Sequence, residues 1–227
     1  MKRAQIALAV LSALVCLAHA PAEEQILCPT DMVRVPGHDS CIDRYPWPNI
    51  KGVVPTTGLS GLPEPHDVEA GRLMDIKGLC ESIDKRPCKR EEWIASCKGP
   101  HESRYPWGNE LPEYIPGERQ LPCNCDNWYT PIESEDKVYA RDPKEMSRLA
   151  KSLEPCGARP TCTSACGMVD AIGQVEEWVE CGKTGRHGWC LMGGHSSAPR
   201  ECGYTIGAHH PKWHYWATGG RCCLSNN

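Results

Sequence analysis

Cysteine is the residue type that offers the most chemistry in this chain. Sixteen cysteines lie among 227 residues, and a thiol can form a disulfide, bind a soft metal ion or act as a nucleophile. Cys16 lies in a segment that we expect to be removed, which leaves fifteen. An odd number means that one thiol is unpaired, pairs outside the chain or binds a metal.

Three histidines form a second group that could do chemistry. His209, His210 and His214 lie close together in the sequence, and imidazoles are common ligands of zinc and copper. No carboxylate or cysteine lies in the same stretch to complete a ligand set. An exposed loop is therefore the simpler interpretation, with a metal site as the alternative.

The N-terminus predicts export. Two basic residues precede an apolar run over residues 6–17, and small residues follow it, as in a secretory signal peptide. We expect residues 1–22 to be this peptide, cleaved after Ala20 or Ala22, and residues 23–227 to form one secreted or periplasmic domain. The apolar run is too short to span a membrane, and no other segment is expected to do so.

Export makes disulfides the default for the remaining thiols. This holds for Cys123 with Cys125 and for Cys162 with Cys166, although both spacings also resemble those of metal sites. The formal net charge is -4, and the sequence has no basic stripe. Nucleic acid is therefore excluded as an expected partner.

Helical patterns are few and short. Residues 66–83 predict a helix with an imperfect apolar stripe and Asp67 as its N-terminal cap. Residues 89–97 predict a second, shorter helix. A third is predicted over residues 143–153, where a proline occupies the first turn.

The rest of the chain indicates short strands and long ordered loops. Leu27–Asp43 has apolar stretches between turn residues, which predicts a strand hairpin. From Thr161 onward glycine, cysteine and tryptophan dominate. The chain has 21 glycines, 20 prolines and no phenylalanine, so we expect an α+β fold that is rich in loops and stapled by disulfides.

Five segments, in chain order, resemble the sulfatase-modifying-factor family, that is, the formylglycine-generating-enzyme-like domain. Together they span nearly all of the chain after the signal peptide. The segments are CPTDMVRVPG (28–37) with CIDRYPWPN (41–49), KRPCKREEW (85–93), RYPWGNE (104–110), GMVDAIGQVEEW (167–178), and the glycine pair 193–194 with GRC (220–222). The resemblance implies a C-type-lectin-like fold with little regular secondary structure.

The resemblance also implies two disulfides, and we predict two more. The implied pairs are Cys80–Cys222 and Cys97–Cys202. The further pairs are Cys28–Cys41, which would bracket the predicted hairpin, and Cys88–Cys223. Seven cysteines stay unassigned: Cys123, Cys125, Cys156, Cys162, Cys166, Cys181 and Cys190.

The family's active members carry two cysteines after the glycine pair, which bind copper(I) and engage the substrate thiol. Here no cysteine lies between Gly194 and Cys202. A gapless comparison puts Ala198 and Gly203 where the catalytic pair should be. We therefore predict no catalytic residue and expect no copper.

A calcium site is a further implication of the resemblance. The family holds calcium with an asparagine, nearby carbonyls and a following glutamate. The matching positions here are Gln174, Val175 and Glu177. Glutamine is one methylene longer than asparagine, so a solvated or packed Gln174 without an ion is the preferred interpretation.

Two arginines in the resembling segments, Arg104 and Arg221, are candidates for internal ion pairs. Asp170 and Glu177 are the expected carboxylate partners. Such pairs stabilise a fold more often than they perform chemistry, so we assign them no catalytic role.

These observations predict an exported domain of the formylglycine-generating-enzyme-like type without formylglycine-generating activity. It would present its loops, chiefly 199–218, to a protein or small-molecule ligand that the sequence does not identify. The alternative is a metal-dependent oxidoreductase of the same superfamily that acts on a thiol or another small substrate. A third hypothesis is a matrix or surface-layer component in which the odd cysteine links chains.

Overall fold

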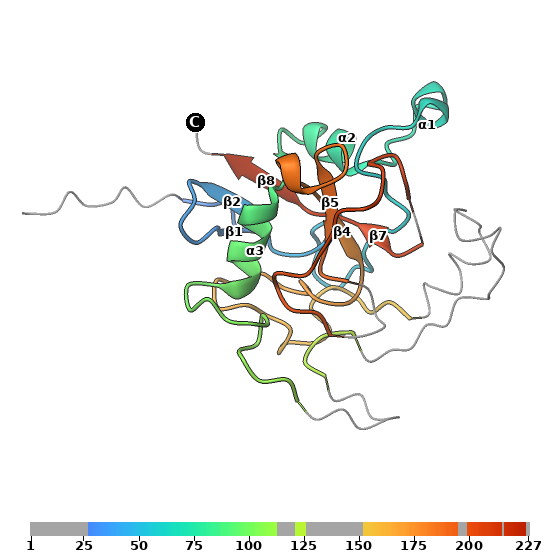
Figure 1. Ribbon diagram of the computed structural model, residues 1–227. Coiled ribbons are helices and arrows are strands. Elements are labelled where there is room, and N and C mark those ends of the chain that lie inside the picture. Colours follow the sequence, from blue (N-terminus) through green and yellow to red (C-terminus); the bar gives the residue numbers. More distant parts are fainter. Residues whose placement is uncertain (1–26, 113–120, 126–151, 195–198, 215, 226–227) are drawn as a thin grey trace, which may run out of the picture.

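The described part of the chain folds into two small sheets, three short α-helices, one 3-10 helix (η1, Gly182–Thr184) and long loops (Figure 1). The computed structural model describes residues 27–112, 121–125, 152–194, 199–214 and 216–225. The predicted signal peptide, and all but the last two residues of the predicted helix 143–153, lie outside these ranges. Within them, no helix is long and apolar enough to cross a membrane.

The first sheet joins the start of the described chain to its end. Its strand order is β1-β2-β8-β3, and all neighbours are antiparallel. The strands are β1 (Met32–Arg34), β2 (Ser40–Asp43), β8 (Cys222–Ser225) and β3 (Arg86–Pro87). The hairpin predicted over Leu27–Asp43 is confirmed as β1 and β2, with Met32 opposite Asp43.

The second sheet comes from the C-terminal half of the chain. Its order is β6-β5-β4-β7, with only the β4–β7 pair parallel. The strands are β6 (Thr205–Ile206), β5 (Trp189–Met192), β4 (Glu176–Glu180) and β7 (Thr218–Gly219). The prediction of short strands and long loops after Thr161 is confirmed, and the fold is α+β.

The prediction of one helix over residues 66–83 is wrong. The structure has α1 (Pro65–Glu69) and α2 (Ile76–Glu81) instead. Gly71 breaks the helix because its backbone adopts a left-handed conformation, with φ of 65°, that glycine tolerates and other residues resist. Asp75 then starts α2 by accepting a hydrogen bond from the Gly78 amide at 2.7 Å. Asp67 lies inside α1 and pairs with Arg72 instead of capping a helix.

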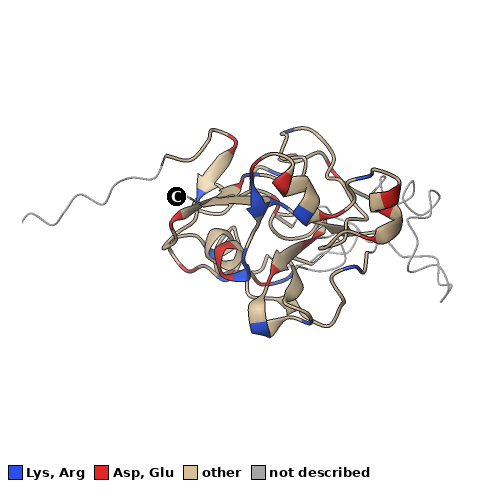
Figure 2. Cartoon of the chain, turned by 90° about the horizontal axis from the view of Figure 1, so that it is seen from above, with Lys and Arg blue, Asp and Glu red and all other residues tan. Residues whose placement is uncertain are grey.

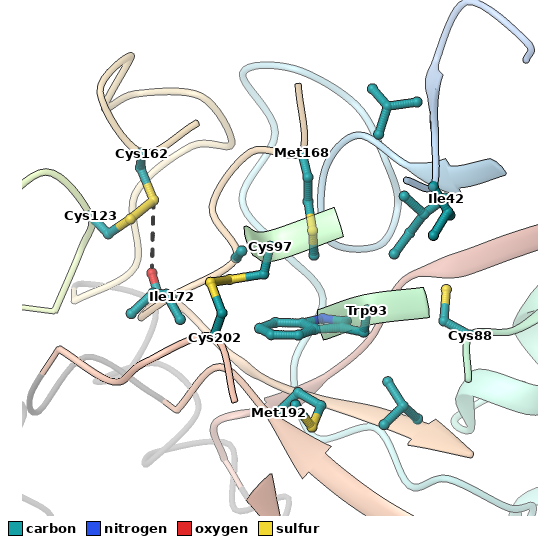
Figure 3. Close-up of a cluster of buried hydrophobic side chains, with 14 of the residues drawn as sticks. Ile42, Cys88, Trp93, Cys97, Cys123, Cys162, Met168, Ile172, Met192 and Cys202 are labelled. Carbon is teal, nitrogen blue, oxygen red and sulfur yellow. Dashed lines mark hydrogen bonds between the residues drawn. A yellow bond between two sulfur atoms is a disulfide. The ribbon is translucent and has the colours of Figure 1, made fainter. Parts of the chain in front are cut away.

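The shorter predicted helix is confirmed as α3 (Arg90–Lys98). It contacts β2 of the first sheet and both β4 and β5 of the second, and it lies beside β1 and β2 in Figure 1. Trp93 projects from α3 and is fully buried. Figure 3 shows its ring between Met168 and Met192, with the Cys97–Cys202 disulfide beside it. Tryptophan, methionine and cysteine thus fill a core that has no phenylalanine.

Six disulfides staple the described chain. They include the four predicted pairs Cys28–Cys41, Cys80–Cys222, Cys88–Cys223 and Cys97–Cys202, and also Cys123–Cys162 and Cys181–Cys190. Three of them close long loops, with sequence separations of 142, 135 and 105 residues. Each contributes about 2–4 kcal/mol, chiefly by restricting the unfolded chain.

A fully buried ion pair connects the two sheets. Arg221 immediately precedes β8, and its Nε and Nη2 atoms each lie 2.6 Å from an oxygen of Glu177 on β4. Neither side chain is exposed to solvent. Arg221 also donates to the backbone carbonyl oxygens of Asp43, Arg44 and Val169 at 3.1–3.2 Å. All five N–H groups of the guanidinium are therefore satisfied, which is what makes its burial tolerable.

We predict that Arg221→Met lowers the free energy of unfolding by about 3–5 kcal/mol, because Glu177 would be left buried without its cation. Guanidinium chloride denaturation with the disulfides intact measures the change. Arg221→Met combined with Glu177→Gln should recover part of the loss, since the amide oxygen can still accept from the Trp93 indole.

The matched control is Arg104→Met, which removes an arginine from an exposed ion pair with Glu201. It should change stability little. Equal stability of Arg221→Met and Arg104→Met would contradict the structural role of the buried pair.

Candidate functional site

The first candidates for reactive thiols are Cys97 and Cys202, which the structure joins in a disulfide. Cys97 lies at the C-terminal end of α3, and Cys202 lies between the glycine pair and β6. Both are fully buried, and the Cys202 amide donates to the Arg104 carbonyl oxygen at 3.0 Å. A sulfur held in a buried disulfide cannot act as a thiolate nucleophile.

The glycine pair lets the chain turn beside this disulfide. Gly193 and Gly194 have φ of 83° and 66°. A β-carbon at Gly193 would lie 2.4 Å from the Ala171 carbonyl oxygen, and one at Gly194 would lie 2.8 Å from the Arg200 side chain. Glycine is required at Gly193 by both its backbone conformation and the lack of space.

Charged and aromatic side chains close to Cys202 in the chain, together with Arg104, form a group that we call the rim. Arg104 donates to Glu201 at 2.6 Å, and both side chains are more than half exposed. The Arg200 guanidinium lies over the Tyr204 ring, 4.6 Å from its centroid, a cation–π contact. Arg104 was expected to pair with Asp170 or Glu177, and that expectation is wrong. The rim thus offers polar contacts to a ligand and no thiol.

The three positions proposed for calcium do not share a ligand site. Gln174 is buried, and its Oε1 accepts hydrogen bonds from the Asn124 side chain at 2.8 Å and the Glu154 amide at 3.1 Å. Both oxygens of Glu177 accept from Arg221, so calcium at Glu177 would have to displace that arginine. Gln174 is packed and hydrogen-bonded in the interior of the protein.

The three histidines proposed for zinc or copper have three different neighbours. His209 stacks on Trp213 with ring centroids 3.7 Å apart. His210 lies against His187, with centroids 4.5 Å apart, and His214 Nδ1 lies 2.6 Å from the Glu64 carboxylate. Across the part of the chain that the structure describes, no three His, Cys, Asp or Glu side chains form a group that could hold a metal.

Three cysteines take no part in the six disulfides: Cys125, Cys156 and Cys166. Burial, followed by the negative charge of Asp170, raises the pKa of the Cys156 thiol to about 12, so it stays protonated and unreactive at neutral pH. Cys125 is buried, whereas Cys166 is half-buried and donates to the Ser96 carbonyl oxygen at 3.1 Å.

Asp170 is a buried acid with a raised pKa. Burial raises the pKa of its carboxyl to about 6, against the opposing effects of the Gly157 amide and Arg221. Its Oδ2 accepts from the Gly157 amide at 2.7 Å, and its backbone is left-handed with φ of 55°. From the sequence, Asp170 is predicted only as a partner of an arginine, because burial of a single carboxyl leaves no pattern along the chain.

No model of a known protein family matches the chain, and no curated protein is significantly similar to it in sequence.

We predict that Asp170→Asn stabilises the fold above about pH 6 by ~1–3 kcal/mol, and that this gain disappears near pH 4. The folded state binds the Asp170 proton more tightly than the unfolded chain does. Wild-type stability therefore falls as pH rises from the unfolded pKa through about 6. Asparagine keeps an acceptor for Gly157 and tolerates the left-handed backbone.

Urea denaturation of both proteins across this pH range measures the difference. Asp39→Asn, at an exposed position, serves as the charge-matched control. Parallel pH–stability curves for wild type and Asp170→Asn would refute the burial cost assigned to Asp170.

Proposed function

We propose that the chain is an exported, disulfide-stapled binding domain of the formylglycine-generating-enzyme-like type that does not generate formylglycine. The single observation that carries this proposal is the buried Cys97–Cys202 disulfide. Cys202 is the only cysteine between the glycine pair and Cys222. Neither Ala198 nor Gly203, which match the family's catalytic pair, is a cysteine, and the neighbouring Cys202 is bonded to Cys97.

The C-type-lectin-like architecture belongs to this proposal. Support comes from the short strands, the long ordered loops and the joining of the first strands to the last one through β2 and β8. The four disulfides predicted from the sequence join cysteines in segments that follow the family order. A frame of this kind can present loops rigidly to a ligand without taking part in chemistry.

Export also belongs to the proposal. Six disulfides in the described chain fit a protein that matures in an oxidising compartment. The loops 199–218 are the surface that we assign to ligand binding. They carry Glu201, which pairs with Arg104, the Arg200–Tyr204 contact and the histidines described above.

We predict that the purified protein does not convert a peptide carrying the Cys-x-Pro-x-Arg motif to its formylglycine form, even with copper(I) and oxygen present. Mass spectrometry of the peptide measures the loss of the cysteine thiol. An active formylglycine-generating enzyme in parallel shows that the assay works. Conversion by this protein would contradict the proposal.

A further inference from the structure

Two segments of the C-terminal half meet to form a rigid surface. The first is the tip of the β4–β5 hairpin, residues 182–188, whose base is closed by the Cys181–Cys190 disulfide. The second is the loop 207–212. The Arg186 amide donates to the Gly207 carbonyl oxygen at 2.8 Å, which joins the two segments.

The loop 207–212 is also held by hydrogen bonds from the segment that precedes α1. The amides of Gly61 and Leu62 both donate to the Pro211 carbonyl oxygen, at 2.7 and 3.0 Å. The surface therefore needs little ordering when it binds a ligand, which lowers the entropic cost of association.

Basic side chains gather on this surface, which we call the basic platform. It consists of five exposed residues: Lys183, Arg186, His187, His210 and Lys212. Neither segment contains an aspartate or glutamate. Figure 2 shows that Lys and Arg positions in blue and Asp and Glu positions in red are mixed along the ribbon.

His210, which belongs to the basic platform, interacts with the positive charges around it. The pKa of His210 is lowered by desolvation and then by the positive charges of His187, Arg186 and Lys212. No carboxylate in the described chain contributes to that shift. An anion placed here would relieve the repulsion and favour the charged imidazoles.

His187 is held in an unfavourable backbone conformation. Its φ of 55° is left-handed, which costs a residue other than glycine about 1–2 kcal/mol. The neighbouring Gly188 also has a positive φ of 85°. Histidine is among the residues that adopt this conformation more readily than most, and the turn sets the His187 ring against that of His210.

The platform lacks the apolar side chains that membrane-surface binding uses. The exposed large hydrophobic residues of the described chain all lie elsewhere, between Leu27 and Leu111. We propose that the basic platform binds an anionic polysaccharide, whose regularly spaced sulfate or carboxylate groups contact Arg186, Lys212 and the two histidines. This inference rests on the proposed function: it names a ligand class for the loop 207–212 and adds the neighbouring hairpin tip to the binding surface.

The test uses the mature full-length protein and fluorescently labelled heparin, measured by anisotropy at low ionic strength. Arg186→Gln combined with Lys212→Gln should weaken binding at least about tenfold, which corresponds to ~1.4 kcal/mol. The matched control is Lys77→Gln with Lys98→Gln, which removes two cations from α2 and α3. This variant loses the same charge, and its affinity for heparin should stay within about twofold of the wild-type affinity.

Binding should also tighten as pH falls from about 7.5 to about 5.5, because imidazoles gain charge in that range. His187→Asn with His210→Asn should abolish this pH dependence while leaving neutral-pH binding nearly unchanged. Asparagine suits both positions, since it tolerates the left-handed backbone and can replace the acceptor for the Lys212 amide.

Polygalacturonate and phosphatidylglycerol vesicles complete the comparison. Binding of heparin alone assigns sulfate as the recognised group, and binding of both polysaccharides assigns a general anionic polymer. Equal weakening by the control variant, binding of vesicles only, or no binding to either polysaccharide would overturn the inference. None of these outcomes bears on the formylglycine assay, which tests the lack of catalysis separately.

Discussion

The fold depends on burying one guanidinium without leaving any of its protons unpaired. Arg221 reaches Glu177 on the second sheet and three backbone carbonyl oxygens contributed by residues 43, 44 and 169. Glu177 in turn accepts from the Trp93 indole at 2.8 Å. The pair therefore fixes the positions of β2, β4, α3 and the start of β8 relative to one another.

The disulfides extend this constraint to the loops. Arg221 is followed by Cys222 and Cys223, which bond to Cys80 and Cys88 on either side of β3. Cys97–Cys202 then anchors the end of α3 to the loop that leads into β6. A chain with so little regular secondary structure gains its rigidity from these links and not from long hydrogen-bonded ladders, which leaves the loops ordered and available for binding.

The parts of the fold that could be predicted are those with a local signal or a motif. The hairpin follows from short apolar stretches between turn residues, and α3 from its periodicity. The resemblance implies two of the disulfides, Cys80–Cys222 and Cys97–Cys202, and the predicted hairpin suggests Cys28–Cys41. The prediction of one helix over 66–83 is wrong because Gly71 adopts a left-handed backbone conformation. A stripe of apolar residues does not reveal such a break. Cys123–Cys162 and Cys181–Cys190 were unpredictable because seven unassigned cysteines allow many pairings.

The functional surfaces were harder to foresee because they depend on contacts between distant segments. His214 meets Glu64 from the loop before α1, so the carboxylate missing from its own stretch comes from elsewhere in the chain. The basic platform unites residues that lie 23 to 29 positions apart in the sequence, and neither segment alone forms a basic run.

The central claim is that Cys202 is locked in a structural bridge and is unavailable for chemistry. Peptide mapping of the native protein, alkylated before digestion and kept unreduced, tests this most directly. The account predicts a linked peptide that contains Cys97 and Cys202, with no alkylated Cys202. Recovery of alkylated Cys202 would show a reactive thiol beside the glycine pair and would contradict the account.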